Sequence, residues 1–224
     1  MKSKLALVGL CLSSSLVFAE EAADLSTPKQ KLSYTVGHQI GQSLKRQELD
    51  IDVDVVSTAI KDVLTGAKVR LSAEDMQAAI QNHQQELGNK RAAMGETNKK
   101  EGQVFLEANK KKEGVVTLPS GLQYKVITQG KGKKPKPTDT IVANYRGTLI
   151  DGKEFDSSYK RGEPATFPVN QVIKGWQEIL PMMTEGSKWQ VFIPSDLAYG
   201  ENGAGADIGP NAALIFDIEL ISIK

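Results

Sequence analysis

The apolar residues of this chain change their spacing near Pro119. Before this proline they recur every three or four residues, which is typical of helices that bury one face. After it they alternate with polar residues, which is typical of strands. Two such runs are Trp189, Val191 and Ile193, and then Leu214, Phe216, Ile218 and Leu220. The sequence therefore predicts a helical N-terminal half and a β-rich C-terminal half.

Residues 1–19 have the features of a secretory signal peptide. Lys2 and Lys4 form a basic start, and residues 5–18 are apolar or small. Ala19 then ends a suitable cleavage site. The apolar run is too short to be a stable membrane anchor, and no later stretch is long enough to cross a bilayer. We therefore expect an exported protein whose mature chain has no membrane span.

Cleavage would also remove Cys11, the only cysteine, so the mature chain would have no disulfide, thiol nucleophile or sulfur ligand. The count of Lys plus Arg falls from 28 to 26 against 27 Asp plus Glu, a net charge near −1. That balance does not predict binding to nucleic acid. The lysines within residues 110–112 and 131–136 are best interpreted as solvated surface.

Residues 20–71 predict a helical dimerisation region. Two stripes of apolar residues recur with helical spacing in this region. The first ends before Asp50, and the second ends at Gly66, a suitable C-cap. The stripes are Leu32, Val36, Ile40 and Leu44, and then Val56, Ile60, Val63 and Leu64. Two helices of this length cannot enclose a core of their own. We therefore expect a homodimer that forms through residues 28–66.

Residues 72–114 predict one long linker helix. Ser72 suits its N-cap, and no proline follows until Pro119. Apolar content thins after Leu87, so the helix is expected to be mostly solvated and to act as a spacer. Three glycines fall seven residues apart: Gly88, Gly95 and Gly102. They are either tolerated neutrally or make the linker compliant.

Several kinds of chemistry find no support in the sequence. His38 and His83, the two histidines, lie far apart in the helical half, so neither a Ser-His-Asp triad nor a zinc site is predicted. No phosphate-binding or dinucleotide-binding glycine motif is present. Glu154 and Asp156 could act as a glycosidase pair, but their neighbours do not fit that pattern. We expect neither a metal nor a cofactor.

The C-terminal half contains ordered motifs that resemble the FKBP family of peptidyl-prolyl cis/trans isomerases, over essentially all of residues 115–224. The motifs are Tyr145-Arg146-Gly147-Thr148-Leu149, Asp151 to Ser158, Val172-Ile173-Lys174-Gly175-Trp176, Ile193-Pro194-Ser195, Ala198-Tyr199-Gly200, Ile208-Gly209-Pro210 and Leu214-Ile215-Phe216. The expected fold class is α+β. Helical N-terminal segments precede a twisted antiparallel β-sheet wrapped on one short helix.

The upstream half resembles the macrophage infectivity potentiator-like proteins of Gram-negative bacteria. The residues that carry this resemblance include Lys31-Leu32-Ser33-Tyr34 and Leu118-Pro119-Ser120-Gly121-Leu122. It implies an exported homodimer, located in the periplasm or on the outer-membrane surface. It also implies that a long helix holds each catalytic domain away from the dimerisation region.

The FKBP resemblance also implies a pocket. Its catalytic residues would be Tyr145, Phe155, Asp156, Ile173, Trp176, Tyr199 and Phe216, with Phe167, Val172 and Ile208 binding substrate. The expected ligands are proline-containing polypeptides and macrolide inhibitors of the FK506 and rapamycin type. Two departures from the family are Ala165, a smaller residue expected in the pocket wall, and a loop from Gly200 to Asp207 that is rich in glycine and alanine.

The resulting hypothesis is a prolyl isomerase that assists the folding of exported proteins. It would bind the twisted X-Pro amide in an apolar aromatic pocket without covalent catalysis. Two alternatives stay open at the level of sequence. One is a periplasmic chaperone or binding module with weak or incidental isomerase activity. The other is a structural or adhesion protein that uses the linker to reach a surface.

Overall fold

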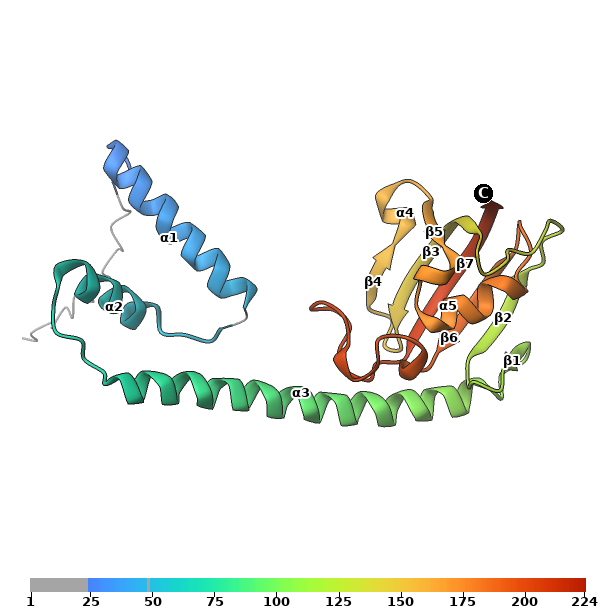
Figure 1. Ribbon diagram of the computed structural model, residues 1–224, viewed down its shortest axis with the longest axis horizontal. Helices are drawn as coiled ribbons and strands as arrows, with labels where there is room; N and C mark the ends of the chain where they lie inside the picture. The colour runs from blue at the N-terminus through green and yellow to red at the C-terminus, as the bar shows by residue number, and fades with distance from the viewer. Residues whose placement is uncertain (1–23, 48) are drawn as a thin grey trace, which may run out of the picture. The chain divides into compact units, whose positions relative to one another are not determined.

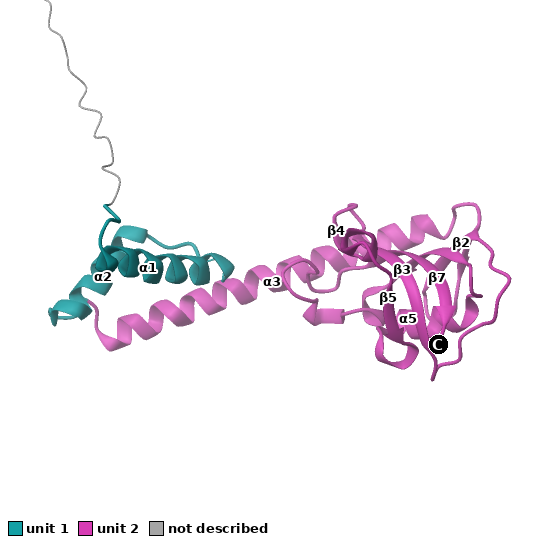
Figure 2. Ribbon diagram, turned by 90° about the horizontal axis from the view of Figure 1, so that it is seen from above, with its two compact units in different colours: residues 1–70 teal, residues 71–224 magenta. Residues whose placement is uncertain are grey.

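The computed structural model describes residues 24–47 and 49–224, so the signal-peptide prediction lies outside the described residues. The chain divides into two compact units, Met1–Arg70 and Leu71–Lys224 (Figure 2). Within the described part of the chain, no helix is long and apolar enough to span a membrane.

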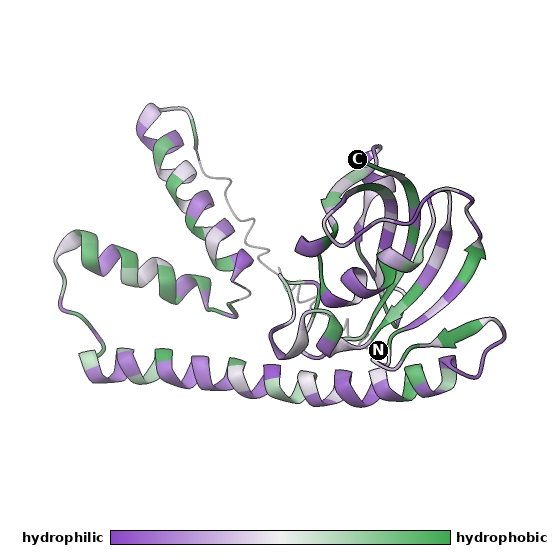
Figure 3. Ribbon diagram, turned by 45° about the vertical axis from the view of Figure 1, so that its right-hand side comes forward, coloured by the Kyte–Doolittle hydropathy of each residue, from purple (hydrophilic) through white to green (hydrophobic). Residues whose placement is uncertain are grey.

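The first unit contains helices α1 (Pro28–Arg46) and α2 (Val53–Thr65). Thr27 begins α1 with a capping box to Gln30. Gly66 ends α2 in the left-handed conformation, as its predicted role as a C-cap requires. Neither helix has a buried residue. Apolar residues recur along both helices (Figure 3) and remain exposed, Val63 at 76% and Leu64 at 80%. Among the described residues of the unit, the two helices therefore leave most of their apolar stripes uncovered.

The second unit begins with α3 (Ala73–Asn109), a continuous helix that passes through all three spaced glycines. The Ser72 hydroxyl caps its start by accepting a hydrogen bond from the Asp75 amide at 3.0 Å. The prediction of a mostly solvated spacer holds only for the first half of α3. In the second half Gly95, Gly102 and Asn109 are buried against the β-rich part of the same unit. The sequence did not indicate this contact because glycine and asparagine carry no apolar signal.

The rest of the unit is a twisted antiparallel sheet wrapped on the short helix α5 (Lys174–Ile179), with a single-turn helix α4 (Ser158–Arg161) after β4 (Figure 1). Strands run in the order β1-β2-β6-β7-β3-β4. Strand β5 pairs with residues 140–143 of β3, which β4 leaves unpaired. The bounds are β1 (Val115–Thr117), β2 (Gln123–Thr128), β3 (Thr140–Leu149), β4 (Glu154–Ser157), β5 (Ala165–Pro168), β6 (Lys188–Ile193) and β7 (Leu214–Ile223). Every pairing is antiparallel. The predicted α+β fold class is confirmed.

The core lies on the face of the sheet that α5 covers. Alternate residues of the predicted β7 run are buried there, from Leu214 at 1% exposure to Leu220 at 0%. The opposite face is partly covered by α3, whose Phe105 ring lies 6.0 Å from the ring of Phe192. Phe192 is therefore buried although it points away from the core formed by Val191 and Ile193.

Two glycines help to set the positions of β4 and α5, one through its backbone conformation and one through a close approach. Gly152 takes φ 91° in the turn that joins β3 to β4, as the Asp151-Gly152 pair predicts. A side chain at Gly175 would lie 2.6 Å from Ile193, so glycine lets α5 pack directly on β6. These two features bring β4 and the N-terminus of α5 to the same end of the core.

Candidate functional site

A cavity of about 550 Å³ opens between β4, α5 and the long loop that joins β6 to β7. All ten residues predicted for the pocket line it: Tyr145, Phe155, Asp156, Phe167, Val172, Ile173, Trp176, Tyr199, Ile208 and Phe216. They come from β3, β4, β5, α5, β7 and the loops between them. A concave, ring-lined hollow of this size is typical of a small-ligand site, and it has room for a proline ring.

Trp176 forms the floor of the cavity and is 4% exposed. Three rings meet it edge to face, those of Tyr145 at 5.5 Å, Phe167 at 5.5 Å and Phe216 at 5.3 Å between centroids. Each such pair contributes about 0.5–1.5 kcal/mol beyond the burial of its area. The indole N–H is buried and has no hydrogen-bond partner within the described residues. The floor is thus fixed by packing alone.

Gly147 of β3 makes room for two of the rings. A Cβ at this position would lie 2.6 Å from the Phe155 ring and 2.8 Å from the Phe216 ring, closer than atoms can approach. The two rings also pack on each other edge to face at 5.5 Å. Gly147 therefore permits the aromatic wall that β4 and β7 share.

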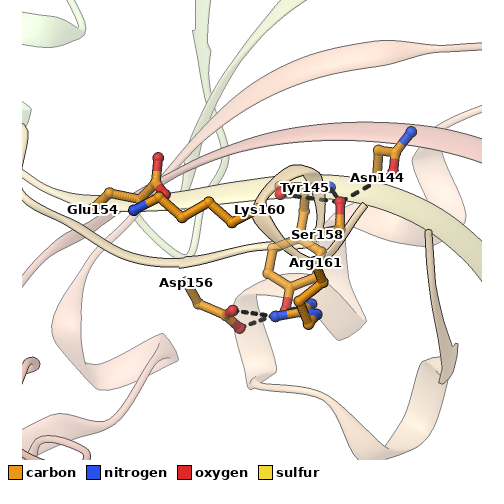
Figure 4. A network of polar contacts seen from close by, with 7 residues as sticks. All are labelled: Asn144, Tyr145, Glu154, Asp156, Ser158, Lys160 and Arg161. Atoms are coloured by element: carbon orange, nitrogen blue, oxygen red, sulfur yellow. Dashed lines mark hydrogen bonds and ion pairs between the residues drawn. The ribbon is translucent and has the colours of Figure 1, made fainter. Parts of the chain in front are cut away.

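Asp156 belongs to a polar network at the cavity rim (Figure 4). The Tyr145 hydroxyl donates to one of its oxygens, and Arg161 donates to the other at 2.5 Å. Arg161 also donates to the Tyr145 hydroxyl at 2.7 Å, and its guanidinium lies 5.3 Å from the centre of the Tyr145 ring. Each member of the network thus has two partners.

This network sets the charge of the carboxylate. Burial by itself raises the pKa of Asp156, but the hydrogen bonds from Tyr145 and Arg161 outweigh it and hold the pKa below its usual value. Burial, followed by the bond to Asp156, raises the pKa of Tyr145. At neutral pH the site therefore contains a fixed negative charge, a neutral phenol and a guanidinium.

Ser158 ties this network to the sheet. It is fully buried at the start of α4 (Ser158–Arg161), where its hydroxyl accepts from the Tyr145 amide at 2.9 Å and donates to Asn144 Oδ1 at 3.0 Å (Figure 4). These bonds hold the short helix that carries Arg161 against β3.

Two further donors lie in the cavity wall. The Tyr199 hydroxyl forms no hydrogen bond within the described chain, and burial together with the charge of Asp156 raises its pKa. The backbone N–H of Ile173, at the N-cap of α5, is likewise not engaged by any of the described residues. Both groups can therefore donate to carbonyl oxygens of a bound peptide.

One expectation about the cavity wall is wrong. Ala165 lies in β5 opposite Ala143 and is not part of the cavity lining. Glu154 does not line the cavity either, because it forms ion pairs with Arg146 at 2.6 Å and Lys160 at 2.9 Å. A glycosidase pair with Asp156 is therefore not assembled in the cavity. Among the described residues, no group of three His, Cys, Asp or Glu could hold a metal ion.

Four lining residues were not predicted: Gln171, Ala204, Gly205 and Asp207. Three of them belong to the glycine- and alanine-rich loop, in which the sequence indicates a departure from the family but no lining residue between Tyr199 and Ile208. Asp207 is anchored by an ion pair of 2.8 Å to Lys153 in the β3–β4 turn. Nothing in the local sequence pattern indicates this contact, because its partners lie far apart along the chain.

Two family models match the chain. Residues 131–221 match the FKBP-type peptidyl-prolyl cis-trans isomerase, and residues 29–126 match the domain amino terminal to FKBP-type peptidyl-prolyl isomerase. Together they cover both described units.

Curated relatives match along nearly the whole chain. "Outer membrane protein MIP" of Legionella longbeachae is 48% identical over 231 residues, covering 100% of this chain and 99% of the relative. "Peptidyl-prolyl cis-trans isomerase Mip" of Coxiella burnetii is 42% identical, covering 97% and 95%. The crystal structure of FkpA from Escherichia coli has a TM-score of 0.64 at 38% identity, covering 89% of this chain and 98% of that one. The chain therefore belongs to the family of FKBP-type peptidyl-prolyl cis-trans isomerases.

Proposed function

We propose that this prolyl isomerase assists the folding of exported proteins by binding the twisted X-Pro amide more tightly than either planar form. The barrier to rotation is lost amide resonance, about 18–20 kcal/mol. Uncatalysed isomerisation takes roughly tens to hundreds of seconds. Each tenfold acceleration requires about 1.4 kcal/mol of preference for the twisted state. No nucleophile or proton transfer is needed.

The cavity supplies that preference in two ways. Its rings suit a twisted amide, whose carbonyl is less polar than that of a planar amide. Trp176 would lie under the proline ring, while the Ile173 N–H and the Tyr199 hydroxyl would donate to the flanking carbonyl oxygens. Asp156, held by Tyr145 and Arg161, would set the polarity beside the rotating bond. The observation that carries the proposal is the ring-lined cavity of about 550 Å³ with unused donors in its wall.

The test is isomerisation of a proline tetrapeptide by the mature chain, with and without a macrolide of the rapamycin type. We expect acceleration over the uncatalysed rate, and we expect the macrolide to abolish it by filling the cavity. Acceleration that persists at saturating macrolide would place catalysis outside this cavity, and no acceleration would overturn the proposed function.

A second function, binding of unfolded proteins, is supported by the exposed apolar faces of α1 and α2. Binding of unfolded proteins would then depend on the apolar faces of α1 and α2 and not on the cavity. Tyr199→Ala should then reduce peptide isomerisation but leave suppression of citrate synthase aggregation unchanged. Equal loss of both activities would assign client binding to the cavity instead.

We further propose that residues 28–66 join two copies of the chain, and that the protein acts in the periplasm or on the outer-membrane surface. The match of residues 29–126 to the domain amino terminal to FKBP-type isomerases supports the assembly. The name of the Legionella relative, an outer membrane protein, supports the location. Fractionation of the producing cells, followed by protease treatment of intact cells, tests the location.

A further inference from the structure

The loop between β6 and β7 forms one side of the cavity but has little regular structure of its own. It contributes Tyr199, Ala204, Gly205, Asp207 and Ile208 to the lining. Its internal order consists of short 3₁₀ turns, one isolated bridge between Ala204 and Ile208 with hydrogen bonds of 2.8 and 3.1 Å, and a hydrogen bond of 2.8 Å that the Asn211 amide donates to the Gly200 carbonyl. Such a segment depends on its surroundings for a defined position.

The outer side of this loop rests on α3 (Figure 1). The Asn98 side chain donates to the Pro210 carbonyl at 2.7 Å, and the Asn211 side chain donates to the Gly95 carbonyl at 3.4 Å. One turn earlier, Arg91 donates to the carbonyl of Asn202. The contact thus extends over successive turns of the helix and engages the loop at both ends of its cavity-lining part.

Steric fit supports the same contact. A Cβ at Gly95 would lie 3.3 Å from both Pro210 and Asn211, whereas a Cβ at Gly88 would have nothing within 4 Å. On the loop side, a Cβ at Gly209 would lie 2.9 Å from both Met94 and Asn98. Glycine on both surfaces therefore allows the backbones of the helix and the loop to approach closely.

Ile208 couples this contact to the cavity. It is 7% exposed and lines the cavity, and only Gly209 separates it from Pro210, whose carbonyl Asn98 holds. A shift of Pro210 away from α3 therefore moves Ile208 with it. We infer that Asn98 and Gly95 of α3 are positioning residues for the isomerase cavity, which hold its Ile208 wall in place through the β6–β7 loop. This inference rests on the proposed function.

The test compares matched variants of the full mature chain. Asn98→Ala removes the bond to Pro210, and Asn89→Ala makes the same change at an exposed position of the same helix. Gly95→Leu opens the contact by bulk, and Gly88→Leu makes the same change where space is free. Three quantities are measured for each variant: amide hydrogen exchange across residues 203–211, kcat and KM for a proline tetrapeptide, and the thermal midpoint.

We expect Asn98→Ala and Gly95→Leu to exchange about fivefold faster across residues 203–211, the change that loss of one ordinary hydrogen bond gives. The value of kcat/KM should fall by a similar factor. KM should rise more than kcat falls, because the Ile208 wall that contacts the bound peptide is displaced. Exchange in β3 and β7 should stay at the wild-type rate. The two control variants should match the wild type in exchange and kinetics.

Three results would overturn the inference, the first two of which concern the loop itself. One is wild-type exchange in the loop of Asn98→Ala, and the other is faster loop exchange with unchanged kcat and KM. Uniformly faster exchange throughout the sheet would also contradict it, since α3 would then only stabilise the domain. If the wild-type chain shows no isomerase activity, the proposed function fails. The exchange comparison would still report whether α3 holds the loop.

Discussion

Asp156 lies beside a wall of rings with a donor fixed on each of its oxygens, and 43% of its side chain is exposed to solvent. Partial burial of a carboxylate has a free-energy cost unless hydrogen bonds and solvent compensate it. Here the Tyr145 hydroxyl and the Arg161 guanidinium offset that cost and keep the pKa of Asp156 low. The same bonds orient the Tyr145 ring, which meets the Trp176 floor edge to face. Asp156 can therefore both contribute a fixed charge beside the cavity and anchor Tyr145 and Arg161 in place.

Replacement of Asp156 tests its role directly. Asp156→Ala should lower kcat/KM for a proline peptide by about tenfold, or about 1.4 kcal/mol, because the fixed charge is lost and Tyr145 is released. Glu154→Ala is the matched control, since this carboxylate lies two residues away in the same strand but outside the cavity. Circular dichroism would show that both variants keep the fold. Unchanged turnover of Asp156→Ala contradicts the assigned role.

The pH profile is a second test at the residue scale. The pKa of Asp156 lies below its ordinary 3.8, and those of Tyr145 and Tyr199 lie above 10.0. No histidine is among the residues that line the cavity, and in the described chain His38 and His83 lie on α1 and α3. We therefore expect kcat/KM to be flat from about pH 5 to pH 9. A solvent-jump isomerisation assay, which needs no protease, measures it. A bell-shaped profile inside this range would indicate acid–base chemistry.

The stability contribution of Asp156 has a defined direction with pH. Its folded pKa is lowered, so the contribution is fully present above the unfolded value near 3.8 and is lost as the pH falls through the folded value. Thermal midpoints between pH 5 and pH 2 should therefore fall less steeply for Asp156→Asn than for the wild type. Parallel slopes for the two proteins would show that the hydrogen bonds to Asp156 do not favour its charged form.

At the scale of elements, the sequence predicts those strand faces and turns that are determined by residues close together along the chain. Alternation placed Leu214 and Phe216 on the buried face of β7, and Asp151-Gly152 predicted the turn before β4. The ten residues that the family resemblance assigned to the pocket are among the fourteen described residues that line the cavity. The burial of Phe192 could not be predicted, because it depends on Phe105, 87 positions earlier in the chain. The cavity-lining role of Asp207 was missed for the same reason.

The spaced glycines of α3 illustrate a different limit. Their regular spacing was visible, but spacing alone does not distinguish flexibility from close packing. The structure shows Gly88 in open space, while Gly95 and Gly102 face atoms of the β6–β7 loop and of Ala213. Glycine in a helix interior costs about 1 kcal/mol relative to alanine. At the two buried positions this cost is offset by the approach of α3 to the domain.

Stability measurements on two leucine variants test this assignment of the glycines. Gly102→Leu should destabilise the chain by about 1–3 kcal/mol, because a Cβ there lies 3.1 Å from the Ala213 Cβ and leaves no room for a larger side chain. Gly88→Leu should stabilise it by up to about 1 kcal/mol, since it gains helix propensity and meets nothing. Urea unfolding of both variants measures the difference. Similar stabilisation by the two substitutions would contradict a packing role for Gly102 and would favour a compliant spacer.

At the scale of the whole molecule, the described chain separates two kinds of apolar surface. The cavity draws all its residues from positions 145–216, within the second unit. The unpartnered faces of α1 and α2 lie within residues 28–65, in the first unit. A short peptide needs only the cavity, whereas a large unfolded client can also contact other apolar surfaces. Peptide turnover and assembly should therefore respond to different substitutions.

Disruption of the apolar face of α2 should separate these properties. Val63 is 76% exposed in the chain, and burial between two copies would make a glutamate there costly. We expect light scattering to give a dimer mass for the wild-type mature chain and a monomer mass for Val63→Glu. The neighbouring Lys61→Glu should remain dimeric, because it changes charge on the same helix without adding charge to the apolar face. Peptide kcat/KM should be the same in all three proteins, since the cavity lies within one copy. A monomeric wild type would exclude assembly through α2, and loss of peptide turnover in Val63→Glu would show that the cavity depends on the partner copy.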